Sequence, residues 1–151
     1  MKGKIYVILL NYNGWKDTIE CLESVLKNDY KSYQVIVVDN NSKNNSIDCI
    51  VSWAKGEREV IYDKNSKLKH LGLPPESKPL EYVFYSKNEA LNGGNKKKEL
   101  ELNSPIVFIQ SGKNEGFSAG NNIGIKYALA KDDFKYIWLL NNDTVVKSNT
   151  L

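Results

Sequence analysis

The sequence contains few of the residues that build metal clusters, disulfide frameworks or membrane spans. Its 151 residues include two cysteines and one histidine, and none of these stands at a metal-ligand spacing, which argues against a zinc site. Cys21 and Cys49 lie far apart within helical apolar patterns, so we interpret both as reduced core residues of a cytoplasmic protein. The first apolar run has only about six residues, too few for a signal sequence or a membrane span.

A strong charge of either sign is also lacking. The net charge of +3 is too small to indicate nucleic acid as a partner, and we interpret the run Lys96–Lys98 as a solvated loop. No membrane anchor or basic amphipathic helix is visible, so peripheral association with the cytoplasmic face of a membrane stays open. With 41% hydrophobic and 26% charged residues, the chain has the composition and length of one globular domain.

Two strand-and-helix units are predicted in the first 55 residues. Residues 5–10 and 33–38 are apolar and rich in β-formers, and each run ends in a polar turn. Helical spacing of apolar residues follows both runs, starting near Asp17 or Thr18 and near Asn45 or Ser46. In the first helix, Glu23 falls on the polar face, which we expect to meet solvent. This order implies parallel strands joined by right-handed crossovers.

The same plan returns after residue 104. Residues 106–109 form a third apolar run, and a helical pattern from about 123 to 131 leads to the run 136–140. That last run is continuous and apolar, which predicts a strand buried on both faces. The chain is therefore expected to be an α/β domain with a mostly parallel, Rossmann-like sheet flanked by helices.

Residues 56–104 interrupt the regular pattern. They hold Leu73-Pro-Pro75, Lys78-Pro79 and Asn92-Gly-Gly-Asn95, with short strand-like runs at 58–62 and 82–85. A long irregular stretch in a small domain is usually an insertion. We expect an insertion that carries at most one hairpin.

Polar residues end three of the four predicted strands. Because parallel strands finish at one edge of a sheet, this edge is the expected ligand site. Amides and carboxylates there can hold a ribose or a base edge and a hard divalent cation, although the same residues also suit ordinary turns. The three groups are Asn11/Tyr12/Asn13, Asp39/Asn40/Asn41/Ser42 and Asn141/Asn142/Asp143.

The segment 114–124, Asn-Glu-Gly-Phe-Ser-Ala-Gly-Asn-Asn-Ile-Gly, is the most specific feature. Its glycines allow close approach of backbone to a ligand or close packing of a helix. It matches neither the dinucleotide fingerprint nor the P-loop. A glycine-rich helix start with asparagine caps would explain it equally well.

Four motifs together resemble the family 2 glycosyltransferases with the GT-A fold, and the rhamnosyltransferase-like branch is the most similar. They occur in the family's order and cover the chain except for the insertion. The motifs are Ile8-Leu-Leu-Asn-Tyr-Asn-Gly14, Val37-Val-Asp-Asn-Asn-Ser42, segment 114–124 and Leu139-Leu-Asn-Asn-Asp-Thr144.

The resemblance implies roles for the polar residues. Asp39 would bind the nucleobase of a nucleotide-sugar donor, either a UDP- or a dTDP-sugar, and Asp143 would hold Mg²⁺ or Mn²⁺ against the diphosphate. The Gly120-Asn121 turn, with Asn114 and Gly116, would contact ribose and sugar. The other residues expected to line the donor site are Asn11, Tyr12, Asn13, Asn41, Phe117, Asn141 and Asn142.

Two departures from the family pattern matter. Asn141 stands where the Asp-x-Asp motif would have its first carboxylate, which should weaken metal binding. The general base that an inverting transferase needs is expected beyond Leu151, so the catalytic residues stay unknown. The fragment alone is therefore expected to bind the donor without transferring its sugar.

The expected function is therefore the donor-binding half of a glycosyltransferase that uses a glycan or a lipid-linked acceptor. Two alternatives stay open, a non-catalytic nucleotide-sugar-binding module and a sugar nucleotidyltransferase. The second is disfavoured because no glycine-rich basic loop follows the first strand to hold a triphosphate.

Overall fold

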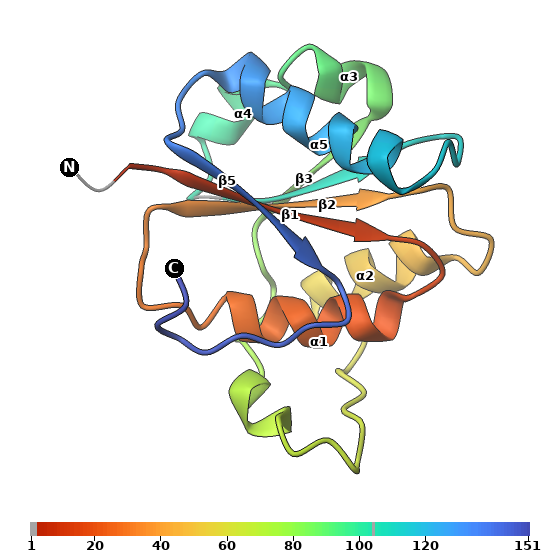
Figure 1. The fold of residues 1–151 in the computed structure, drawn as a ribbon, viewed down its shortest axis with the longest axis vertical. Coiled ribbons are helices and arrows are strands. Elements are labelled where there is room, and N and C mark those ends of the chain that lie inside the picture. The colour runs from red at the N-terminus through yellow and green to blue at the C-terminus, as the bar shows by residue number, and fades with distance from the viewer. Residues whose placement is uncertain (1–2, 104) are drawn as a thin grey trace.

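The protein is an α/β sandwich with one parallel sheet between two layers of helices (Figure 1). The computed structural model describes residues 3–103 and 105–151. In this part of the chain five strands pair in the order β3-β4-β2-β1-β5, all parallel. The strands are β1 (Ile5–Asn11), β2 (Tyr33–Asp39), β3 (Tyr82–Ser86), β4 (Ile106–Gln110) and β5 (Tyr136–Asn141).

The helices divide between the two faces of the sheet. Figure 1 shows α1 and α2 beneath it and α3, α4 and α5 above it. Their bounds are α1 (Trp15–Val25), α2 (Ser46–Lys55), α3 (Lys87–Leu91), α4 (Lys96–Leu100) and α5 (Phe117–Lys131), with a short 3-10 helix η1 at Lys69–Gly72. The Rossmann-like prediction is thus confirmed, although α1 begins at Trp15, earlier than the expected Asp17 or Thr18.

Alternating residues of the central strands fill two separate cores. On β1, Val7 and Leu9 pack with α1 and α2, whereas Tyr6 and Ile8 pack with α5. Both strands β1 and β2 are buried on both faces, which is why their sequences are uniformly apolar. Gly124 lets α5 lie close to the sheet, since a Cβ there would come within 2.8 Å of Ile8 Cγ2.

Strand β5 corrects one expectation. It lies at the edge of the described sheet, where β1 is its pairing partner, and it is not buried on both faces. Tyr136 is 57% exposed and Leu139 is 48% exposed. The apolar run was read correctly as a strand, but hydrophobicity alone does not distinguish a central position from an edge.

The expected insertion at 56–104 divides into two parts. Residues 57–81 follow α2 and pass below α1, where η1 lies, before the chain enters β3 (Figure 1). The predicted run 58–62 is not a strand. The run 82–85 is strand β3, which pairs in parallel with β4, so the two runs do not form the hairpin that the sequence allowed. The second part thus contributes a further strand, Tyr82–Ser86, to the sheet, and the lysines 96–98, expected in a loop, begin the short helix α4.

The segment 57–81 also changes the environment of Glu23. This side chain was expected on the solvent face of α1, yet it is fully buried. Its carboxylate accepts hydrogen bonds from Trp53 Nε1 at 2.8 Å and from the backbone N–H of Glu76 at 2.7 Å, and it pairs with Lys78 at 2.8 Å. The reason is that 57–81 covers the outer face of α1, a contact that the helix periodicity does not contain.

Candidate functional site

The polar strand ends converge as predicted. Asn11 is the register partner of Asp39, and Asp39 is the partner of Gln110 on β4. On the other side of β1, Leu10 pairs with Asn141. The carboxyl edge of the sheet therefore carries a continuous row of amides and one carboxylate.

Asp39 is the centre of a hydrogen-bond network at this edge. Its side chain is fully buried. Oδ1 accepts from Asn11 Nδ2 at 2.7 Å and from the Ser42 hydroxyl at 2.6 Å, while Oδ2 accepts from the Ser42 backbone N–H and from Gln110 Nε2, both at 3.0 Å. These four donors match the four lone-pair sites of a carboxylate. A nucleobase therefore reaches Asp39 only if Ser42 or Gln110 gives up its bond.

The network continues across β1 to the loop after β5. Asn11 Oδ1 accepts from the Thr18 hydroxyl at 2.8 Å, and Thr18 Oγ1 accepts from Asn142 Nδ2 at 3.0 Å. Asn11 and Thr18 are fully buried, so their bonds are shielded from water. The ends of β2, β1 and β5 are thus held in one fixed arrangement.

The loop after β1 is tied to the loop after β2. The Asn13 backbone N–H donates to the Ser42 hydroxyl, and Asn13 Oδ1 accepts from the Lys43 N–H, both at 2.8 Å. Asn13 and Asn41 adopt left-handed backbone angles, with φ of 56° and 57°, which asparagine tolerates better than most residues. Tyr12 remains 47% exposed. Tyr12 therefore offers an exposed aromatic ring to a ligand.

The start of α5 is attached to the same edge through Asn40, which the sequence placed in the polar group at the end of the second strand but not among the residues lining the donor site. Asn40 Nδ2 donates to Asn114 Oδ1 at 3.1 Å and to the Gly116 carbonyl at 3.2 Å. Asn114 Oδ1 also accepts from the Gly116 N–H at 2.9 Å. The available sequence signal was the position of Asn40 next to Asp39 at a strand end. The sequence interpretation also missed Thr18 and Gln110.

The glycine-rich segment behaves partly as a packing element. The expected Gly120-Asn121 turn is wrong, because α5 begins at Phe117 and both residues lie inside it. Gly120 is buried, and a Cβ there would meet Leu10 Cδ1 at 2.5 Å, whereas Asn121 Nδ2 bonds the Phe117 carbonyl of its own helix. Phe117 is 65% exposed, and Asn114 and Gly116 are exposed beside it. These three, rather than 120 and 121, offer accessible surface.

Asp143 is exposed just beyond β5, next to a hollow of about 310 Å³. Asp17, Glu20 and Asp63 also line this hollow. Burial, followed by the charges of Asp17 and Asp63, raises the pKa of Glu20. Burial, with a contribution from the Asp143 charge, raises the pKa of the Cys21 thiol to about 12, and this thiol donates to the Asn141 carbonyl at 3.9 Å.

The donor set around Asp143 limits the metal that it could hold. Among the described residues, no three histidine, cysteine, aspartate or glutamate side chains are arranged to bind an ion. One exposed carboxylate and neighbouring amide oxygens fit a hard cation that takes most of its six or more ligands from elsewhere. The residues therefore fit Mg²⁺ or Mn²⁺ carried by a diphosphate better than a metal bound by the protein alone.

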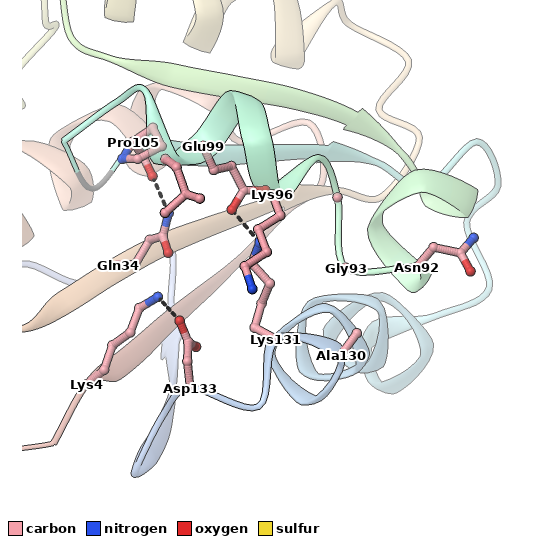
Figure 2. Close-up of a pocket in the computed structure, with 12 residues that line it drawn as sticks. Lys4, Gln34, Asn92, Gly93, Lys96, Glu99, Pro105, Ala130, Lys131 and Asp133 are labelled. Carbon is pink, nitrogen blue, oxygen red and sulfur yellow. Dashed lines mark hydrogen bonds and ion pairs between the residues drawn. The ribbon is translucent and has the colours of Figure 1, made fainter.

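A separate hollow of about 410 Å³ lies at the opposite, amino edge of the sheet. Figure 2 shows its two ion pairs, Lys4 with Asp133 at 2.7 Å and Lys131 with Glu99 at 2.5 Å. Burial opposes ionisation of Asp133, but the Lys4 ammonium and the Tyr6 hydroxyl outweigh it and lower the pKa of this carboxyl. None of the predicted site residues lines this hollow, so it is distinct from the carboxyl edge.

No helix in the described part of the chain is long and apolar enough to cross a membrane.

One family model and several solved structures resemble this chain. Residues 6–72 match the model described as glycosyl transferase family 2, which confirms the resemblance over these residues. No curated protein sequence matches significantly.

Two structures of S. aureus TarS are among the similar solved structures. TarS 1-349 in complex with UDP aligns with a TM-score of 0.53 and 16% identity, covering 97% of this chain and 29% of that chain. TarS 1-349 in complex with UDP-GlcNAc aligns with a TM-score of 0.47 and 16% identity, covering 96% and 28%. At this identity the UDP complex establishes the fold alone, which confirms the predicted GT-A, Rossmann-like architecture. The chain spans less than a third of the length of that relative.

Proposed function

We propose that this chain, whose residues 6–72 match the model of glycosyl transferase family 2, is the nucleotide-sugar-binding part of a glycosyltransferase. The observation that carries the proposal is the buried network that joins the ends of β1, β2 and β5 through Asn11 and Asp39. Such a fixed row of amides and hydroxyls suits a ligand rich in hydroxyl groups, because the geometry of the row changes little when the ligand binds. UDP is bound in the similar TarS structure, which supports a nucleoside diphosphate as the ligand class.

The donor base and ribose are proposed to bind beside Tyr12 and the Asn114–Phe117 loop. Tyr12 and Phe117 offer exposed rings, and Asn114 offers an exposed amide. Asp39 either organises this surface from beneath or contacts the base after a shift of Ser42 or Gln110. In both cases the charge and the position of the Asp39 carboxylate contribute to the proposed donor site.

The diphosphate is proposed to lie beyond β5, next to Asn141, Asn142 and Asp143. Asp143 is exposed there and would hold the cation, while Asn142 is oriented by its bond to Thr18. When bound, Mg²⁺ or Mn²⁺ supplies positive charge that stabilises the leaving nucleoside diphosphate. The chain's own part is to hold Asp143 at the strand end through the β1–β5 pairing.

The transfer step is proposed to invert the anomeric carbon, in line with the family resemblance. An acceptor hydroxyl, on a glycan or a lipid-linked glycan, would attack that carbon as the bond to the diphosphate oxygen breaks and the nucleoside diphosphate leaves, while a carboxylate takes the hydroxyl proton. We assign no general base to the described residues. We propose that the acceptor approaches through the hollow beside Asp143, which residues of the segment 57–81 help to line.

The proposal predicts metal-assisted binding of UDP or dTDP and of the matching nucleotide sugar, measured by isothermal titration. With Asp143→Ala, affinity measured with Mg²⁺ should fall by about tenfold, roughly 1.4 kcal/mol, because the carboxylate ligand is lost. Affinity measured in EDTA should not change. Asp48→Ala, at an exposed position on α2, is the control and should bind as the unmodified protein does.

Absence of binding to every nucleoside diphosphate would reject the donor-site assignment. Tighter binding of a nucleoside triphosphate than of a nucleotide sugar would favour a nucleotidyltransferase instead. Equal loss of affinity with and without Mg²⁺ in Asp143→Ala would remove Asp143 from the metal site.

A further inference from the structure

Among the described residues, Asn40 is the side chain at the carboxyl edge whose hydrogen bonds connect β2 to the loop before α5. Its side-chain Nδ2 donates to two acceptors in the loop before the helix, Asn114 Oδ1 and the Gly116 carbonyl. Its backbone N–H donates to the Asn11 carbonyl at 2.8 Å. Asn40 is therefore fixed to β1 through its backbone and to the α5 loop through its side chain.

The direction of the Asn40 carboxamide follows from its partners. Both groups near Nδ2 are oxygen acceptors, so a flipped amide would place oxygen against oxygen. The Asn40 Oδ1 atom is buried and has no hydrogen-bond partner among the described residues. Burying an unpaired carbonyl oxygen lowers stability. Asn40 therefore acts through the two bonds of Nδ2, whereas its Oδ1 adds nothing to the stability of the core.

The loop that Asn40 holds has few other constraints. Gly116 is the residue that precedes α5, with φ of 100°, and no side chain caps the helix there. Asn114, Gly116 and Phe117 are all exposed. The loop is also attached by the Ser111 N–H, which donates to the Asp39 carbonyl at 3.0 Å, and by the exposed ion pair of Glu115 with Lys87 at 3.1 Å. The described side-chain bonds from the sheet to Asn114 and Gly116 are those of Asn40, since the Asn114 bond to Gly116 is internal to the loop.

We propose that Asn40 is a positioning residue for the donor: it sets the distance between the Asp39 network and the Asn114–Phe117 loop without contacting the ligand. This inference rests on the proposed function. It also makes a claim about the loop itself, which can be measured without any nucleotide.

Replacement of Asn40 by alanine should separate its effect on the position of the loop from its effect on the stability of the fold. In Asn40→Ala, Asn114 Oδ1 keeps the Gly116 N–H as a partner, and the Gly116 carbonyl keeps the Gly120 N–H at 3.1 Å. The unpaired oxygen disappears as well. The urea midpoint should therefore stay within about 0.3 M of the original value, while Asn114 and Gly116 lose their side-chain bonds to β2.

The test combines titration with UDP and backbone NMR. Asn40→Ala should bind UDP about tenfold more weakly, and the heteronuclear NOE of Asn114 and Gly116 should fall in the absence of nucleotide. Asn114→Ala removes the other end of one bond, and the double variant should bind little more weakly than Asn114→Ala alone. Asn122→Ala, an exposed amide on α5, is the matched control and should change neither quantity.

Each other outcome is decisive. Unchanged affinity and NOE values in Asn40→Ala would overturn the inference, and so would additive losses in the double variant. A large drop of the urea midpoint would show that Asn40 serves stability instead. If the unmodified chain bound no nucleotide, the proposed function would fail, and the NOE values would still decide whether Asn40 holds the loop.

Discussion

Asp39 illustrates what one side chain contributes to the carboxyl edge. The resemblance implied contact with a nucleobase, and the structure places the carboxylate under the surface with all its acceptor sites used by Asn11, Ser42 and Gln110. Contact with a base is still a prediction. What the structure establishes is that Asp39 fixes three loops in relation to one another.

Replacement of Asp39 by asparagine should lower both stability and ligand affinity. The new amide would direct N–H groups toward existing donors, so we expect a loss of about 2–3 kcal/mol in the free energy of unfolding. UDP affinity should fall by a similar factor with and without Mg²⁺, since the proposed role of Asp39 is at the base and the proposed metal ligand is Asp143. Urea denaturation and titration measure the two effects, and Asp48→Asn is the exposed control.

At the scale of elements, the segment 57–81 depends on one buried charge on α1. Glu23 is fully buried and bonds Trp53 on α2 together with Glu76 and Lys78 from the segment. Lys78 Nζ also lies 4.6 Å from the centre of the Trp53 ring. These contacts hold the segment whose Asp63 lines the hollow beside Asp143.

Glu23→Ala should release this segment. It leaves Lys78 without its buried partner, so we expect the free energy of unfolding to fall by about 3–4 kcal/mol. Limited proteolysis should then cleave within 57–81 faster than elsewhere in the chain. Glu59→Ala removes an exposed glutamate of the same segment and should leave the cleavage rate unchanged, and a Glu23 variant as resistant as this control would contradict the anchor role.

At the scale of the whole molecule, buried and partly buried tyrosines couple the stability of the fold to alkaline pH. Burial raises the pKa of Tyr33, Tyr62 and Tyr85 to about 12. Burial, assisted by the Asp133 carboxylate, also raises the pKa of Tyr6. These phenols stay protonated in the folded state at a pH where the unfolded chain loses its protons.

Stability should therefore fall as pH rises. The unfolded tyrosines ionise from about pH 10, so the free energy of unfolding should decrease between pH 10 and 12 and be pH-independent in this respect below that range. Urea midpoints at several pH values, with phenolate absorbance near 295 nm, measure this. Tyr33→Phe should reduce the slope, and Tyr136→Phe, at an exposed position, is the control.

Whether a feature could be predicted from the sequence depends on the range of the interactions that produce it. Strands β1, β2, β4 and β5 were predicted because apolar runs and polar ends are local patterns. The place of β5 at the edge, the entry of β3 into the sheet and the burial of Glu23 were not predicted, because each depends on segments distant in sequence.

The sequence alone determined the α/β class, the parallel connection of the strands and the collection of amides and carboxylates at their carboxyl ends, because these follow from short-range periodicity and from the geometry of parallel sheets. Only the tertiary structure decided how those residues interact. In the folded chain Asp39 is buried in a hydrogen-bond network and Asn40 bonds the loop before α5, whereas Tyr12, Phe117 and Asp143 stay exposed. Hydrogen bonds select partners by distance and direction in space, and that information exists only after the chain has folded.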